Sequence, residues 1–357
     1  MEIMSKTRRF PALLLKGAML LFLVAVFPGC KSDRPGVYSP PRFKETVEEE
    51  FEIVSDEIFG VNAISDMVVY GSKIIVCAPN LEDGTILHIY DKESGEPLMH
   101  TLNSGRGPKE LIYPGNMSFN GDSGTMTFLD LIASKRLDID VDGLMEHGLD
   151  AVEEVYWQSP LWSTHNIVLS NGSLHTYNIS YLQRDTSSVV RLELIDNDGK
   201  LLSTYNEFPV IDDDRKRFMM YNNELIAVSP DEEKFAITST LGGILETFSM
   251  KGGELRNIAT KYFIEPDFTL EGDYSNLIAS FCDLYATDEV LLAAYGGETE
   301  FGTGINNIAI FDWNGNPLKL IRTGHRIERL CLDSEDNALY AMIQDSEGRP
   351  YIGRIRL

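Results

Sequence analysis

The sequence is poor in positive charge. Lys and Arg together number 31 against 55 Asp and Glu, and the formal net charge of the 357-residue chain is −24 at pH 7. Because such a surface repels a phosphate backbone, the charge argues against nucleic-acid binding. Hydrophobic residues make up 43% of the chain and charged residues 24%. These proportions are those of a folded protein and exclude a disordered one.

Cysteine is also scarce, with four in the whole chain. None lies in a C-x-x-C pair or at the spacing of a zinc site. Cys77, Cys282 and Cys331 each lie inside an apolar run. Three cysteines cannot all pair with one another, so we expect these to be buried small hydrophobic residues.

The motifs of common catalytic and cofactor sites are missing as well. The six histidines show neither H-x-H nor H-E-x-x-H spacing, and there is no P-loop and no G-x-S-x-G elbow. The segment Gly105–Gly107 begins like a phosphate-binding glycine loop but lacks the third glycine and the helix that should follow. The sequence therefore predicts no catalytic residue, no metal and no cofactor.

The long apolar run of the chain lies at its N-terminus. Three basic residues, Lys6, Arg8 and Arg9, precede an uncharged stretch of eleven residues, 17–27. This stretch is too short to span a bilayer, which takes roughly 20 residues, and is typical of an export signal. We therefore expect a signal peptide over residues 1–29.

The end of this segment resembles the lipobox of bacterial lipoproteins, in which a small residue precedes the lipidated cysteine. Here Gly29 stands before Cys30, although Phe27 and Pro28 depart from the usual pattern. The resemblance implies lipid attachment at Cys30 in the cell envelope of a Gram-negative bacterium, at the outer membrane, on its periplasmic or its surface face. The polar, proline-rich residues 30–45 then form a flexible tether. An ordinary secretory signal with an incidental cysteine is the alternative.

Beyond the signal no segment shows a sustained helical period, and the pattern is all-β. Short β-branched or alternating runs are separated by turns rich in Gly, Asn and Asp. One hairpin pattern recurs six times, roughly every 50 residues, which is a propeller-blade period. The six hairpins cover residues 67–76, 117–128, 167–176, 225–237, 282–292 and 330–341.

A second series of turns closes outer hairpins, and it has five members where the first has six. These turns lie at residues 90–95, 140–143, 196–199, 251–253 and 311–315. Each contains a Gly, the residue that most readily adopts the positive φ that such turns need. After the sixth inner hairpin the chain ends on one more strand, residues 352–357. We therefore predict that Thr46–Ser55 supplies the missing outer strand of the last blade and closes a six-bladed β-propeller, residues 46–357.

Several segments resemble the TolB-like six-bladed propellers of bacterial lipoproteins. They are Phe311–Lys319, Ala286–Asp288 with Ala294–Gly297, Ser229–Asp231 and Gly105–Glu110, in which Lys109 departs from the family pattern. The family is defined by its fold, and the resemblance implies no reaction and no fixed set of functional residues.

Function is expected on one face of the propeller, where its long loops emerge. Aromatic and Arg side chains are the preferred anchors of protein interfaces. The candidates for partner binding in these loops are Arg106, Tyr113, Tyr181, Arg184, Arg215, Arg217, Tyr221, Tyr274 and Phe301. We expect a monomeric, non-catalytic binding or scaffold module for a protein, peptide or glycan. The alternative is a hydrolase or lyase at the central channel, to which Asp66, His325 and Glu328 would contribute.

Overall fold

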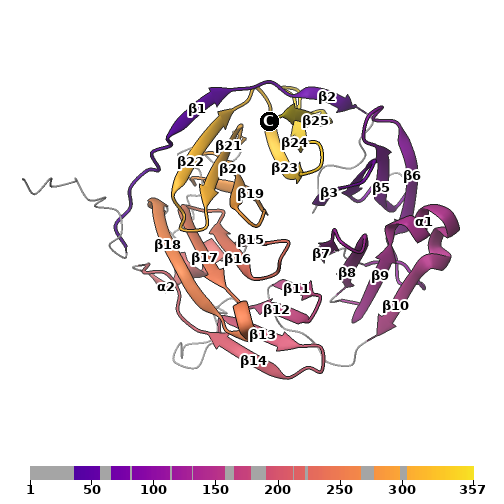
Figure 1. The fold of residues 1–357 in the computed structure, drawn as a ribbon, viewed down its shortest axis with the longest axis horizontal. Coiled ribbons are helices and arrows are strands. Elements are labelled where there is room, and N and C mark those ends of the chain that lie inside the picture. The colour runs from indigo at the N-terminus through magenta and orange to yellow at the C-terminus, as the bar shows by residue number, and fades with distance from the viewer. Residues whose placement is uncertain are drawn as a thin grey trace, which may run out of the picture. The chain divides into compact units, whose positions relative to one another are not determined.

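The chain folds as a β-propeller with six blades (Figure 1). The computed structural model describes residues 36–56, 66–80, 83–112, 115–130, 132–156, 165–177, 190–211, 213–221, 224–266, 277–297 and 304–357. All of them belong to one compact unit, Ser32–Leu357. The predicted fold class is confirmed, whereas the predicted signal peptide and Cys30 lie outside the described residues.

Blades I to III follow one another along the chain, each with its innermost strand first. Blade I has strands β3 (Asp66–Tyr70), β4 (Lys73–Cys77), β5 (Thr85–Asp91) and β6 (Pro97–Asn103). Blade II has strands β7 (Gly115–Asn120), β8 (Thr125–Asp130), β9 (Lys135–Asp140) and β10 (Val152–Tyr156). Blade III has strands β11 (His165–Leu169), β12 (Gly172–Thr176), β13 (Leu192–Asp196) and β14 (Leu201–Tyr205).

Blades IV to VI repeat this order, and two of them gain a strand from the N-terminal segment. Blade IV has strands β15 (Glu224–Val228), β16 (Lys234–Ser239), β17 (Gly243–Ser249) and β18 (Arg256–Ile264). Blade V has strands β19 (Phe281–Ala286), β20 (Val290–Tyr295), β21 (Asn307–Asp312), β22 (Pro317–Arg322) and β1 (Glu45–Glu48). Blade VI has strands β23 (Arg326–Asp333), β24 (Ala338–Gln344), β25 (Pro350–Arg356) and β2 (Glu52–Ser55).

The N-terminal segment closes the ring, as predicted, but with a shorter strand. Residues 52–55 pair antiparallel with β25 and complete blade VI. Residues 45–48 pair in parallel with β22 and form a fifth strand of blade V. We call residues 36–55 the strap, and in Figure 1 its strands β1 and β2 follow the outer rim. The start of the strap, within the predicted tether, lies against blade IV, where the Ser39 N–H donates to the Tyr262 carbonyl over 2.9 Å.

The six inner hairpins are confirmed, and so are four of the five outer turns. Gly95, Gly199, Gly253 and Gly315 have φ between +70° and +80° in those turns, which non-glycine residues adopt only with strain. The prediction of a tight turn at residues 140–143 is wrong. Between β9 and β10 the chain forms helix α1 (Val141–His147) and a 3₁₀ turn, Gly148–Ala151. Val141 and Leu144 of α1 are fully buried, which explains why a helix replaces the turn.

A second helix corrects the prediction that no helix follows the signal. Residues 214–217, part of a charged run without apolar periodicity, begin helix α2 (Asp214–Tyr221). Its last residues, Met220 and Tyr221, are 0% and 1% exposed and pack into the core between blades III and IV. The sequence hides this helix because the apolar residues that anchor it come only in its final turn.

Apolar packing joins neighbouring blades around most of the ring. Hydrophobic clusters fill the seams between blades I and II, III and IV, IV and V, V and VI, and VI and I. In the described part of the chain the seam between blades II and III is polar instead. There Ser118 Oγ of β7 accepts a hydrogen bond from the Val168 N–H of β11 over 3.1 Å.

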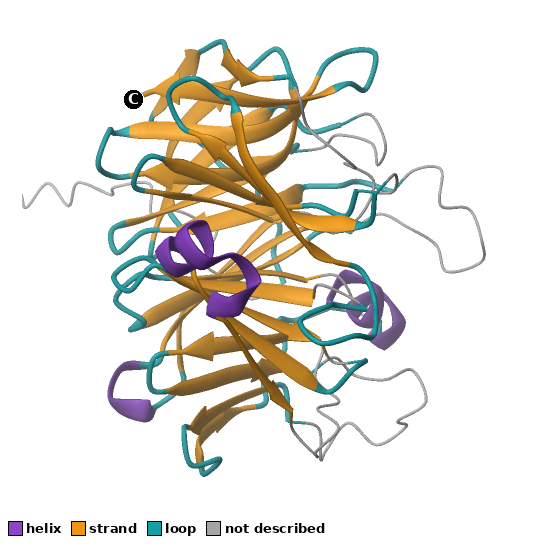
Figure 2. Ribbon diagram, turned by 90° about the vertical axis from the view of Figure 1, so that its right-hand side faces the viewer, coloured by secondary structure: helices purple, strands orange, loops and turns teal. Residues whose placement is uncertain are grey.

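The strands run between two faces of the ring, which Figure 2 shows from the side. Turns within the inner and outer hairpins lie at one face. Connections between the second and third strands, and between blades, lie at the other, which we call the loop face. The innermost strands, β3, β7, β11, β15, β19 and β23, surround the axis (Figure 1).

Candidate functional site

The connection between blades I and II forms a compact loop, Ser104–Ile112, at the loop face. Its ends are held together because the Gly105 N–H donates to the Leu111 carbonyl over 3.0 Å. The carboxylate of Glu110 folds back under the loop and accepts the Gly107 N–H over 2.7 Å. A Cβ atom at Gly105 would lie 2.0 Å from Glu110 Oε2. A side chain at position 105 would therefore displace the Glu110 carboxylate, so the glycine allows close approach to a carboxylate of the chain itself and not to a phosphate.

Two charged side chains of blade II support this loop from below. Lys135 is 1% exposed, and its Nζ donates to the Gly107 carbonyl and to Glu154 Oε1, both over 3.0 Å. The other oxygen of Glu154 accepts the Lys109 N–H over 3.2 Å. Burial alone would raise the pKa of Glu154, but hydrogen bonds from Tyr156, Lys135 and Lys109 outweigh it and hold the pKa below its usual value. The carboxylate thus remains ionised and ties the outer strand of blade II to the loop.

The loop and its support expose two side chains of the kind that anchors interfaces. Arg106 is exposed at the tip of the loop. Tyr156, at the end of β10, is 63% exposed while its hydroxyl donates to Glu154 Oε1 over 2.7 Å. Because the backbone beneath them is already ordered, contact with a partner would cost little further conformational entropy. We call the exposed side chains of Arg106 and Tyr156, together with the loop Ser104–Ile112, the Arg106 surface.

Two other predicted anchors belong to the interior packing of blades III and IV. Tyr221 is 1% exposed, and its hydroxyl donates to Glu246 Oε2 over 3.0 Å. Arg217 is half-buried, with its guanidinium 5.7 Å from the centre of the Phe208 ring. A partner could reach Tyr221 only if helix α2 moved.

The remaining predicted anchors cannot be placed. Arg215 lies in α2, but its side chain is outside the described part of the structure. Five others lie wholly outside the described residues: Tyr113, Tyr181, Arg184, Tyr274 and Phe301. Their role in partner binding stays a prediction.

Ionisable groups also gather around the axis, at the loop-face ends of the innermost strands. Asp66 begins β3, Asp283 lies in β19 and Arg329 lies in β23, so blades I, V and VI each contribute one group. Burial raises the pKa of Asp66 to about 6 and that of Asp283 to about 7, although Arg329 opposes both shifts. Asp283 Oδ2 also accepts the Leu330 N–H over 2.7 Å. Two carboxyls that titrate near neutral pH therefore lie beside one guanidinium.

Blades III and IV place a second pair of ionisable groups at the same end. Glu224 begins β15, is 5% exposed, and has a pKa raised to about 7, chiefly by burial. His165 begins β11, and burial lowers its pKa to about 4. At neutral pH this imidazole is uncharged.

The axial residues proposed from the sequence are placed only in part as expected. Asp66 and Glu328 do lie in innermost strands. His325 does not face the axis: its ring lies beside the strap, 6.2 Å from the Phe51 ring, with Nδ1 4.0 Å from Glu50 Oε2. Asp283 and Arg329 were missed, although Asp283 lies inside a predicted innermost strand and Arg329 directly precedes one.

Within the described residues, no group of three or more His, Cys, Asp or Glu side chains is arranged to hold a metal ion. Nor is any helix in the described ranges both long and apolar enough to cross a bilayer.

Comparisons with known proteins support the architecture. No protein-family model matches the chain, and no curated protein matches its sequence. A member of the DUF4221 family from Bacteroides vulgatus has a similar structure, with 10% identity, 86% of this chain and 96% of that chain covered, and a TM-score of 0.54. A gluconolactonase from Xanthomonas campestris shows 13% identity over 90% of this chain and 98% of its own, with a TM-score of 0.50. The structure of U3-55K shows 11% identity over 86% of this chain and 98% of its own, with a TM-score of 0.51. At these identities the likeness shows the fold alone.

Proposed function

We propose that this propeller is a lipid-anchored, TolB-like envelope protein that binds a protein, peptide or glycan partner at its loop face without catalysing a reaction. Cys30 carries the lipid, and residues after it lead into the strap. The protein acts as a monomer at the outer membrane. The partner contacts the Arg106 surface.

The observation that carries the proposal is the support beneath Arg106. A fully buried lysine, Lys135, and the carboxylates of Glu110 and Glu154 are all used to hold one exposed loop in a single shape. Burying a lysine is unfavourable unless its charge is paired. Such an arrangement serves a surface whose shape must be ready before the partner arrives. The guanidinium of Arg106 suits a carboxylate, phosphate or sulfate group on that partner.

Site-specific photocrosslinking in intact cells tests this surface. A photoreactive amino acid at position 106 or 156 should give the same discrete crosslinked product. The matched control is position 198, which is exposed in the β13–β14 turn on the opposite face. Equal crosslinking from positions 106 and 198, or none from 106 and 156 together with no binding to a glycan array, would contradict the proposal.

A second function, hydrolysis or elimination at the axis, is favoured by one observation. Asp66 and Asp283 have pKa values of about 6 and 7, and a general acid or base works best near the operating pH. Lactone, ester and glycoside substrates would test it. Turnover that is lost in Asp283→Asn, and kept in Arg106→Ala, would support the axial enzyme over the binding module.

A further inference from the structure

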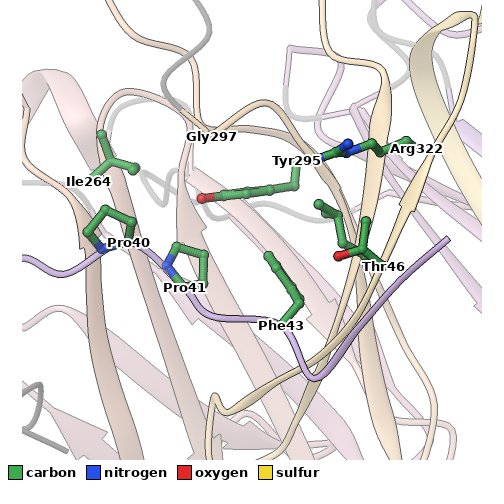
Figure 3. Close-up of a pocket in the computed structure, with 9 residues that line it drawn as sticks. Pro40, Pro41, Phe43, Thr46, Ile264, Tyr295, Gly297 and Arg322 are labelled. Carbon is green, nitrogen blue, oxygen red and sulfur yellow. The ribbon is translucent and has the colours of Figure 1, made fainter. Parts of the chain in front are cut away.

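The hollow between the strap and blades IV and V is lined by a side chain that belongs to the core (Figure 3). Tyr295 is only 6% exposed there. Its ring packs against those of Phe43, Phe281 and Phe311, so a ligand in the hollow would meet no open ring. Groups better suited to a ligand lie on blade I.

Two imidazoles face each other across the outer strands of blade I. His88 of β5 and His100 of β6 are directly opposed in the antiparallel register, so both side chains lie on the same face of the sheet. Their Nδ1 atoms are 2.8 Å apart, and the ring planes are tilted by 59°. His88 is fully buried, whereas His100 is exposed. The pair is therefore fixed on one side and accessible to solvent on the other.

The backbone determines the tautomer of His88. Its Nε2 lies 2.8 Å from the Ala78 carbonyl oxygen, and because a carbonyl only accepts, Nε2 carries the proton. Burial lowers the pKa of His88, so at neutral pH the ring is uncharged and its Nδ1 presents a lone pair to His100. A carbonyl that accepts the far N–H is the usual support of a histidine that binds a metal ion.

The spacing of the two Nδ1 atoms fits a metal ion whose ligands lie at right angles. With metal–nitrogen distances of about 2.0 Å, neighbouring nitrogens are about 2.8 Å apart around a square-planar ion and about 3.3 Å apart around a tetrahedral one. The pair has the first of these spacings. Square-planar or tetragonal sites with N and O ligands are characteristic of Cu²⁺ and Ni²⁺, and Cu²⁺ binds the more tightly of the two.

A carboxylate adds negative charge beside the pair. Asp83 directly precedes β5, and hydrogen bonds from Thr85 hold the pKa of its carboxyl below the usual value. The imidazoles of His88 and His100 lower this pKa further, so an ionised carboxylate lies near both rings and attracts a cation. In the described part of the chain no third His, Cys, Asp or Glu is placed to complete a three-ligand site. Water would therefore fill the remaining positions.

We infer that His88 and His100 bind one Cu²⁺ ion through their Nδ1 atoms. The ion replaces the hydrogen bond between the rings, and the proton of His100 moves from Nδ1 to Nε2, so both rings remain neutral. Neither histidine belongs to the Arg106 surface or to the axial groups, and the site therefore goes beyond the proposed function. Sequence spacing does not reveal it, because the two residues are twelve apart and meet only across the strand pair.

Titration of the full, untagged chain with Cu²⁺ tests the inference. Calorimetry should show one equivalent bound with a dissociation constant of about 10 μM or lower. The electron paramagnetic resonance spectrum of the complex should show hyperfine splitting from two nitrogen ligands. Zn²⁺, which prefers the wider tetrahedral spacing, should bind at least about tenfold more weakly. Equal affinity for Zn²⁺ and Cu²⁺ would contradict the square-planar assignment.

His100→Gln should weaken Cu²⁺ binding at least about tenfold, the loss that even an outer partner of a metal ligand causes, and should remove one nitrogen from the spectrum. Its far-UV circular dichroism should match that of the wild type, because His100 is exposed. The control is His147→Gln, in α1, where the side chain is 67% exposed; it should change neither affinity nor spectrum. Absence of an equimolar Cu²⁺ site, or equal affinity of wild type and His100→Gln, would overturn the inference.

Discussion

Arg191 of blade III and Glu246 of blade IV form a buried, bidentate ion pair. Nη1 lies 2.9 Å from Oε1 and Nη2 lies 2.5 Å from Oε2, and the side chains are 1% and 2% exposed. The Phe208 and Tyr221 rings lie 4.6 and 4.9 Å from the guanidinium carbon. The pair therefore joins two blades and also fixes the end of helix α2.

Removal of one charge from this pair should be costly. Glu246→Gln leaves the guanidinium of Arg191 buried without its counter-charge, and we expect the free energy of unfolding to fall by about 3–5 kcal/mol in urea titrations. Glu254→Gln, which breaks the exposed pair with Arg256, should cost less than about 1 kcal/mol. Similar losses in the two variants would show that the buried pair is not a structural joint.

Stability should fall as pH rises through neutrality. Burial raises the pKa of Asp283 from its ordinary 3.8 to about 7 in the folded protein. The folded state therefore holds a proton that the unfolded chain has already released, and the stability present below pH 4 is lost as pH rises toward 7. Between pH 5 and 8 the wild type should lose about 2.5 kcal/mol more than Asp283→Asn. Urea titrations at four pH values would measure this, and parallel pH profiles would contradict it.

The polar seam between blades II and III contains an amide that is costly to bury. Asn166 is 1% exposed, and in the described part of the chain neither of its amide atoms has a hydrogen-bond partner. Asn166→Val should raise the free energy of unfolding by about 1 kcal/mol, because it removes two unpaired polar atoms from a strand position.

Asn166→Asp is the matched control for Asn166→Val and should have the opposite effect, since it places a charge at the same position. It should lower the free energy of unfolding by about 3 kcal/mol or more at pH 7. A loss above about 1 kcal/mol in Asn166→Val would contradict the assignment. It would mean that water or another group satisfies the amide.

Ring closure depends on close approach of the strap to β25. A Cβ atom at Gly353 would lie 2.9 Å from atoms of Phe51 and Ile343. Gly353→Ala should therefore lower the free energy of unfolding by about 1–3 kcal/mol. Gly121→Ala, in the β7–β8 turn, meets only one atom, at 4.0 Å, and should change stability by less than about 0.5 kcal/mol. Equal thermal midpoints for the two variants would show that the strap adapts to the added methyl group.

Much of the architecture could be predicted from local pattern. The hairpin repeat and its turn residues are short-range signals, and they identified the blades and the ring closure. Helix α2 was hidden because Met220 and Tyr221 are anchored by blades III and IV and not by their own segment. The split of the strap between blades V and VI was likewise hidden, since it depends on which distant edge strand is available.

The candidate site was less predictable for the same physical reason. Arg106 could be proposed as an exposed arginine in a glycine-rich loop. Its support could not, because Lys135 and Glu154 are separated from it in sequence and act through burial. The axial groups Asp283 and Arg329 come from blades V and VI, and their altered pKa values arise only when the ring closes.

The central claim, that the loop face binds a partner through the Arg106 surface, is tested most directly by affinity. The partner captured by crosslinking would be titrated against wild type, Arg106→Ala and Arg256→Ala by calorimetry. We predict that Arg106→Ala weakens binding by about 2 kcal/mol, roughly thirtyfold, as expected of an interface anchor, while Arg256→Ala binds as wild type does. Equal affinity of Arg106→Ala and wild type would contradict the account.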